Sequence, residues 1–155
     1  IEILQKLGKK EPNNPYVMEL TGQIYLDKGN TTTAISCFEN SLKILPNAYS
    51  IRLLLAHALI ESGAQNNIQE AIANLERIVL ENSNEVLAWY LLVNAYRKAG
   101  QNDKADLSHA EVALRTGDLE LARSRAQRAS KSSQVDVKNK ALSILSEAVE
   151  AKGGA

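Results

Sequence analysis

The stretch that determines the fold is residues 14–47, which read NPYVMELTGQIYLDKGNTTTAISCFENSLKILPN. Its first half places Gly22 and Tyr25 on one face of a helix, and its second half places Ala34 and Phe38 on one face of another. Residues three and four apart share a helical face, so each half has the spacing of an amphipathic helix. The stretch therefore predicts two helices joined by a turn.

Two short signals mark where these helices end. Gly29 and Asn30 follow the first helix, and glycine suits the left-handed conformation that commonly caps a helix C-terminus. Pro46 follows the second helix, and proline cannot continue the hydrogen-bond ladder of a helix. Neither helix buries its apolar face alone, so this hairpin is expected to be one unit of an array.

The order of small and large residues resembles the tetratricopeptide repeat, a 34-residue helix–turn–helix. Counted from Pro15, Gly22, Tyr25, Ala34 and Phe38 fall at positions 8, 11, 20 and 24 of that pattern. The resemblance implies an all-α fold, a tetratricopeptide-repeat-like solenoid of antiparallel helix hairpins with about nine helices. An ordinary helical bundle with accidental small residues is the alternative, which the continuing register disfavours.

The register continues along the chain and predicts one helical repeat domain over residues 1–152. Pro12 precedes Pro46 by 34 residues, so the chain enters in mid-pattern at Ile1 and is expected to be a fragment. The predicted parts are a half repeat (1–13), a repeat (14–47), a repeat with an insertion (48–84), a repeat (85–116), an overlapping repeat (103–131), a capping helix (134–151) and a tail (153–155).

Two irregularities interrupt the spacing. The second unit separates Gly63 from Ala71 by eight residues, where the first unit has five between its glycine and alanine. Three extra residues are therefore expected in the turn, with Asn67 as the N-cap.

The second irregularity is a half repeat, because Gly117 follows Gly100 by only 17 residues. The helix 103–116 is expected to serve two repeats, packed against both 86–99 and 118–131. In the capping helix, Ala141, Leu145, Ala148 and Val149 are expected to point inward.

The composition limits the classes of partner. Basic and acidic residues number 18 each, so the formal net charge is zero, which disfavours a nucleic-acid or polybasic membrane surface. No apolar run approaches the roughly 20 residues that span a bilayer. We therefore expect neither nucleic-acid binding nor membrane insertion.

Longer segments resemble a particular protein family. The segments NPYVMELTGQIYLDKG (14–29), EAIANLERIV (70–79) and AWYLLVNAYRKAGQNDKADLSHAEVALRTGDLELARSRAQRA (88–129) resemble the C-terminal repeat domain of bacterial periplasmic zinc metalloproteases. These gluzincin-type enzymes resemble the proteases that control outer-membrane protein assembly. The resemblance implies a periplasmic, non-catalytic recognition domain, with zinc only in an upstream catalytic domain. The final segment SSQVDVKNKALSIL departs from that family.

The residues of this chain predict no catalytic, metal or cofactor site. The metalloprotease motif H-E-x-x-H is absent, and His57 and His109 lack a second His or Cys at ligand spacing. Asp106, Ser108 and His109 invite a catalytic-triad reading, but adjacent helical residues point about 100° apart. His109 takes the position of Phe38 and is expected to be a packed imidazole with one hydrogen bond. Trp89 is expected to be a core wedge between repeats, and a ligand-stacking role is the alternative.

The predicted function is protein binding through the concave face that first helices line. The predicted partner is a protein or extended peptide segment in this groove, possibly the upstream catalytic domain. The alternative is a free-standing scaffold or chaperone-like repeat protein of an envelope assembly complex. The face is expected to centre on Tyr90 and Arg97, and the predicted groove residues are Tyr16, Glu19, Gln23, Leu53, His57, Ile60, Leu87, Tyr90, Asn94 and Arg97.

A carboxylate clamp for acidic C-termini is a less favoured form of that site. Asn94, Arg97 and Lys98 resemble part of such a clamp, whereas Asp27 and Glu61 stand where it would require lysine.

Overall fold

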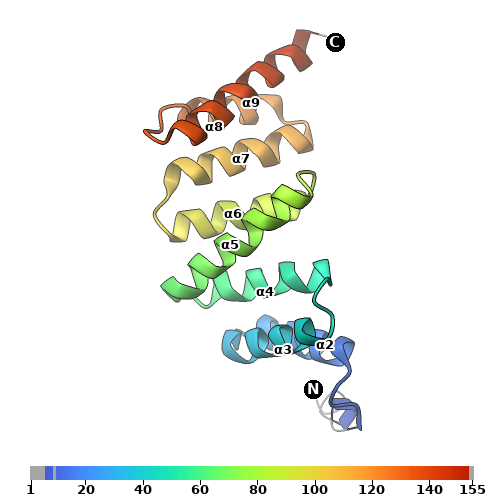
Figure 1. Cartoon of the computed structure of the whole chain (residues 1–155). Coiled ribbons are helices and arrows are strands. Elements are labelled where there is room, and N and C mark those ends of the chain that lie inside the picture. The colour runs from blue at the N-terminus through green and yellow to red at the C-terminus, as the bar shows by residue number, and fades with distance from the viewer. Residues whose placement is uncertain (1–5, 9, 154–155) are drawn as a thin grey trace. The chain divides into compact units, whose positions relative to one another are not determined.

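A computed structural model describes residues 6–8 and 10–153. It forms two compact units, Ile1–Asn74 and Leu75–Ala155, and each is described by itself. Every described element is helical: helical residues at 6–8 and 10 precede the helices α2 to α9 (Figure 1). The predicted all-α fold of sequential hairpins is confirmed. The predicted stripe through Ile1 and Leu4 lies outside the described residues.

The first unit contains the hairpin predicted from residues 14–47. Helix α2 spans Pro15–Asp27 and α3 spans Thr31–Ile44, and the two pack against each other. Asn14 caps α2 by accepting from the backbone N–H groups of Tyr16 and Val17 at 3.0 and 3.4 Å, which satisfies donors that lack a partner within the helix. Helix α4, Tyr49–Glu61, packs against α3.

Close packing between α2 and α3 explains the small residues of this hairpin. A Cβ atom on Gly22 would lie 2.7 Å from Cε1 of Phe38, and both Phe38 and Ala34 are fully buried. Ser41 stands where the repeat usually has alanine, and its hydroxyl donates to the carbonyl of Pro15 at 2.9 Å. Ser41 is fully buried, and this hydrogen bond satisfies its hydroxyl group and links α3 to α2.

The glycines predicted to end the first helices have the expected conformation. The φ values are 76°, 69°, 74° and 81° for Gly29, Gly63, Gly100 and Gly117. They lie in the left-handed region, which residues other than glycine adopt only at an energetic cost. The turns of the array thus occur where the repeat register places them.

Helix α5, Gln65–Glu81, corrects the prediction for the insertion. It has 17 residues against 14 in α3, so the three extra residues lengthen the helix and not the turn. Asn67 lies inside α5, where its side-chain amide donates to the hydroxyl of Ser62 at 2.9 Å. The prediction that Asn67 is the N-cap is therefore wrong.

The second unit is built around a shared helix. Helix α7, Asn102–Thr116, is continuous and packs against α6, Val86–Lys98, and against α8, Leu119–Ala129. This confirms the predicted double use of the helix 103–116. Its core with α8 and α9 is rich in alanine, and the buried cluster consists of Leu107, Ala110, Ala113, Ala122, Ala126, Ala129, Val137, Ala141 and Ile144.

Helix α9, Val135–Gly153, packs against α7 and α8. Ala141 and Ala148 are buried as predicted, but Val149 is 55% exposed, so its predicted inward position is wrong. Gly153, predicted to belong to a tail, is the last residue of α9, and residues 154–155 lie outside the described part. None of the helices in that part is long and apolar enough to cross a membrane.

Candidate protein-binding surfaces

The second unit contains a cavity that the sequence did not predict. Its volume is about 540 Å³, within the range of ligand pockets in proteins. It is lined by α5, α6, α7 and α9 and by the loop after α5, and is called the Trp89 cavity below. The lining residues are Glu76, Val79, Leu80, Ser83, Trp89, Leu92, Tyr96, Lys104, Leu107, Ser108, Glu111, Arg115, Gln134, Asp136, Val137 and Lys140.

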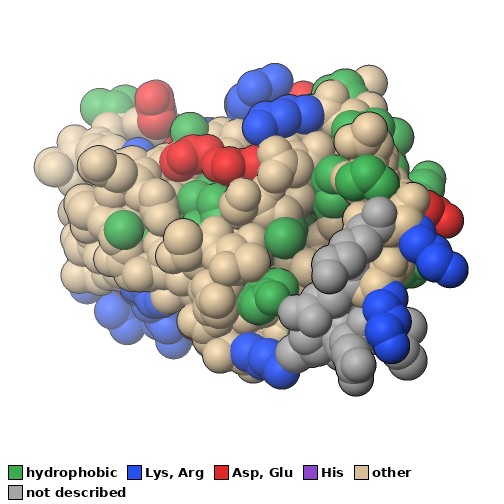
Figure 2. All heavy atoms as spheres, turned by 90° about the horizontal axis from the view of Figure 1, so that it is seen from below, with side chains coloured by type: hydrophobic (Ala, Val, Ile, Leu, Met, Phe, Trp, Pro, Cys, Tyr) green, Lys and Arg blue, Asp and Glu red, His purple; other side chains and the backbone are tan. Residues whose placement is uncertain are grey.

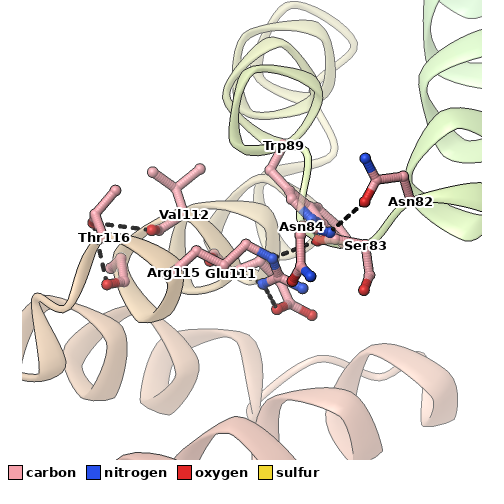
Figure 3. A network of polar contacts seen from close by, with 9 residues as sticks. Asn82, Ser83, Asn84, Trp89, Glu111, Val112, Arg115 and Thr116 are labelled. Atoms are coloured by element: carbon pink, nitrogen blue, oxygen red, sulfur yellow. Dashed lines mark hydrogen bonds and ion pairs between the residues drawn. The ribbon is translucent and has the colours of Figure 1, made fainter.

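Polar contacts hold Trp89, which lines this cavity, in place (Figure 3). The indole N–H donates to the carbonyl of Ser83 at 2.8 Å. The guanidinium of Arg115 lies over the indole ring, 5.2 Å from its centroid, which is within cation–π range. Arg115 also donates to the carbonyl of Ser83 and pairs with Glu111. The loop after α5 is thereby joined to both α6 and α7.

A second group of contacts orders three other lining residues, Glu76, Tyr96 and Lys104. The hydroxyl of Tyr96 donates to Oε1 of Glu76 at 2.5 Å, and Nζ of Lys104 lies 5.5 Å from the centroid of the Tyr96 ring. Burial raises the pKa of Tyr96, and the hydrogen bond to the Glu76 carboxylate raises it further. The phenol therefore stays protonated and remains a donor to Glu76 throughout the physiological pH range.

A smaller cavity of about 410 Å³ adjoins the first and shares Glu111, Arg115 and Lys140 with it. Together the two cavities follow α7 and α9; the larger has aliphatic, aromatic and charged lining residues, and the smaller is lined mainly by polar and charged ones. Such a mixture suits an extended protein segment, because apolar groups provide buried area while a few polar groups orient the ligand.

The structure corrects the interpretation of Trp89. A core wedge between repeats was expected, whereas the side chain is only partly buried and lines the cavity. The polar stripe Lys104, Ser108, Glu111 and Arg115 on α7, spaced by four, three and four residues, is the sequence signal that the prediction missed.

The predicted groove residues divide into three groups by exposure. Leu53 and Ile60 are only 8% and 1% exposed, so both belong to the core and their assignment to a binding surface is wrong. Glu19 and Asn94 are partly buried, and the exposed residues are Tyr16, Gln23, His57, Leu87, Tyr90 and Arg97. Figure 2, a view from below, shows hydrophobic side chains interspersed with charged ones on that face.

His109 was expected to be a packed imidazole with one hydrogen bond. It is partly buried, and its Nδ1 atom is buried without a hydrogen-bond partner, so Nε2 is the nitrogen left for that bond. Burial lowers the pKa of His109, Arg125 and Arg97 lower it further, and Asp106 opposes them. Among the described residues, no group of three or more His, Cys, Asp and Glu side chains has the arrangement of a metal site.

Comparison with known proteins places the chain in a family. The model of a family described as ChAPs (Chs5p-Arf1p-binding proteins) matches residues 1–149. The chain belongs to the ChAPs family.

A curated relative and a solved structure support the same fold for this member of the ChAPs family. The chain is 27% identical over 112 residues to tetratricopeptide repeat protein 5 of Bos taurus, a match that covers 66% of the chain and 26% of that protein. It thus spans about a quarter of that relative. The crystal structure of MamA matches with a TM-score of 0.67 and 21% identity, over 97% of this chain and 85% of that one.

These matches confirm the tetratricopeptide-repeat-like fold and the class of protein-interaction domain. None of the three descriptions names a protease. The predicted relationship to periplasmic metalloproteases therefore gains no support from them.

Proposed function

We propose that the chain is a non-catalytic recognition domain that binds an extended protein segment in the Trp89 cavity. The observation that supports this most directly is the pair of adjoining cavities along α7 and α9, of about 540 and 410 Å³. Because they share Glu111, Arg115 and Lys140, the two adjoining cavities suit several consecutive side chains better than one compact small molecule. The ordered Trp89–Arg115–Glu111 contacts favour binding, because a preformed wall loses little conformational entropy when a ligand arrives.

The apolar part of the cavity provides the attraction. Leu80 is 81% exposed at the cavity edge, and Val79, Leu92 and Leu107 line its interior. Covering such surfaces removes apolar area from water, worth roughly 25 cal/mol per Å². Tryptophan and arginine are enriched among residues that dominate binding energy, and both lie at the rim.

Site-specific photo-crosslinking tests this proposal. A photo-reactive phenylalanine analogue is placed at Leu80, and at Leu142 on α9 as the matched control. Leu142 is 48% exposed and does not line either cavity. In extract of the source cells, the Leu80 probe should yield crosslinks to a defined segment of a partner, while the Leu142 probe should not. Equal products from both positions would contradict binding in the cavity.

The identity of the partner is a separate question. The description of the family names Chs5p and Arf1p as proteins that its members bind, which supports a protein ligand for this chain as well. The two purified proteins are therefore suitable first probes for the Leu80 crosslinker.

The metalloprotease setting remains a proposal of its own, supported by the segments 14–29, 70–79 and 88–129. In that setting the full-length protein is periplasmic and carries a zinc-binding catalytic domain before this one. The coding sequence upstream of Ile1 tests it: an H-E-x-x-H helix would support the protease. Another repeat or a lipoprotein signal would favour the alternative of a free-standing envelope scaffold.

A further inference from the structure

The second unit has another surface, on which arginines outnumber carboxylates. We propose that this surface, formed by Arg97, Arg125 and Arg128, binds an acidic protein segment. It is called the arginine surface below and is independent of the Trp89 cavity.

Asp106 holds two of the arginines in place. Its Oδ1 atom accepts a hydrogen bond from Nη1 of Arg125 at 3.0 Å. Its Oδ2 atom forms an ion pair with Arg128, 3.0 Å from Nε. Asp106 lies on α7 and is only 8% exposed. Because both arginines lie on α8, their pairing with Asp106 holds α8 against α7. The side chain of Arg128 nevertheless remains 62% exposed. Because a guanidinium has five N–H donors, most donors of Arg128 remain able to bind a second carboxylate.

The charges of this surface do not balance. One carboxylate, Asp106, faces two arginines, and Arg97 adds a third positive charge from the last turn of α6. Burial lowers the pKa of His109, Arg125 and Arg97 lower it further, and Asp106 opposes them. The group of three arginines and one aspartate has a formal net charge of +2.

The arginine surface and the Trp89 cavity lie on opposite faces of α7. The cavity is lined by Lys104, Ser108, Glu111 and Arg115, which form one stripe at helical spacing. Asp106 is two positions from Lys104, and successive helical residues are rotated by about 100°. Asp106 is therefore rotated by about 200° from the cavity stripe, so the two surfaces can bind different segments.

Apolar side chains accompany the charge and favour a protein over a nucleic acid. Leu87 and Tyr90 are 50% and 54% exposed, and lie on the same stripe of α6 as Arg97, ten and seven positions before it. Arginine binds carboxylates with paired hydrogen bonds, while tyrosine and leucine contact aliphatic side chains. The whole chain has no net charge, so it lacks the basic character typical of nucleic-acid-binding domains.

Fluorescence anisotropy with defined probes tests the proposal. The probe is a fluorescein-labelled nine-residue peptide with two glutamates to each leucine, and the comparison peptide has glutamine in place of each glutamate. We expect the glutamate peptide to bind more tightly, and its affinity to fall about tenfold in the double variant Arg97→Gln, Arg128→Gln. Both arginines are exposed, so the helices should be retained, which circular dichroism verifies.

A matched variant separates local recognition from overall charge. Arg77→Gln with Arg123→Gln removes the same charge from exposed and partly buried positions outside the arginine surface, and should change the affinity less than about twofold. Equal loss in both double variants, equal affinity for both peptides, or no binding of the glutamate peptide would overturn the proposal. Tighter binding of a labelled oligothymidine would overturn it in favour of a nucleic acid.

Discussion

Gly22 and Phe38 show how one hydrogen atom in place of a methyl group sets the distance between two helices. A Cβ at Gly22 would lie 2.7 Å from Cε1 of Phe38, and the ring is fully buried and has little room to move. Gly22→Ala should therefore lower the free energy of unfolding by about 1–3 kcal/mol, although alanine is the better helix former. Urea denaturation followed by circular dichroism measures the change.

A double-mutant cycle distinguishes this steric cause from a general effect on α2. In the background of Phe38→Leu, which removes the contacted ring atoms, Gly22→Ala should cost less than in the wild-type chain. The same cost in both backgrounds would show that the ring does not set the limit.

His109 determines a pH dependence of stability. The folded chain lowers the pKa of this imidazole from its ordinary value of 6.5, so the unfolded chain binds the proton at a higher pH. The imidazole's contribution to stability is thus present above about pH 6.5 and decreases as the pH falls below that value. His109→Phe should reduce the loss in free energy of unfolding between pH 7.5 and 5.5.

The matched control is His57→Gln, because His57 is exposed in α4. If the stability of His109→Phe and of the wild type fell in parallel over that pH range, the assignment to His109 would be wrong.

At the level of elements, α7 is the part that the spacing of glycines predicted best. Gly100 and Gly117 both have left-handed φ values, and the helix between them packs on α6 and α8. A local signal was sufficient here, because only glycine adopts this conformation readily and the 17-residue interval leaves room for one helix.

The same local reasoning failed where long-range packing decides the outcome. The extra residues before Ala71 extend α5, although the sequence alone is equally compatible with a longer turn. Leu53 and Ile60 occupy register positions of a concave face, but neighbouring helices bury both. Trp89 has the position of a core residue, but it lines a cavity and lies under the guanidinium of Arg115, a residue of another helix that is distant in sequence.

The alanines of α7 are predicted to be a packing requirement and not a consequence of helix propensity. Ala110 is fully buried in the cluster that joins α7 to α8 and α9. Ala110→Leu should destabilise the chain by about 1–3 kcal/mol, because three added carbons do not fit a close-packed junction. Thermal and urea unfolding measure this effect. Ala73→Leu, at an exposed position of α5, should change stability by less than about 0.5 kcal/mol.

At the scale of the whole molecule, the prediction of a protein-binding repeat domain agrees with the family match and the fold comparison. The individual binding residues were harder to predict, because helix register fixes which face a residue occupies but not how deeply neighbouring helices bury it. The identity of the partner depends on which residues are exposed, so it was the property that the sequence predicted least well.

A chain of this kind should have neither tight metal binding nor proteolytic activity of its own. Tag-free protein dialysed against metal-free buffer should retain far less than one zinc ion per chain in an elemental assay. It should also leave labelled casein uncleaved. Stoichiometric zinc, or cleavage that a chelator stops, would show a metal site that the described residues do not reveal.

The most direct test of recognition through the Trp89 cavity is the fluorescence of Trp89 itself. The sequence has one tryptophan, so its emission reports on this cavity without added label. The partner segment identified by crosslinking at Leu80 is titrated into the wild type, Leu80→Ser and the control Leu142→Ser. Binding should shift the Trp89 emission. Leu80→Ser should weaken the affinity for the segment about tenfold, the equivalent of 1.4 kcal/mol, while Leu142→Ser should leave the affinity unchanged. Binding by calorimetry with no change in Trp89 emission, or equal affinities for all three proteins, would contradict recognition through this cavity.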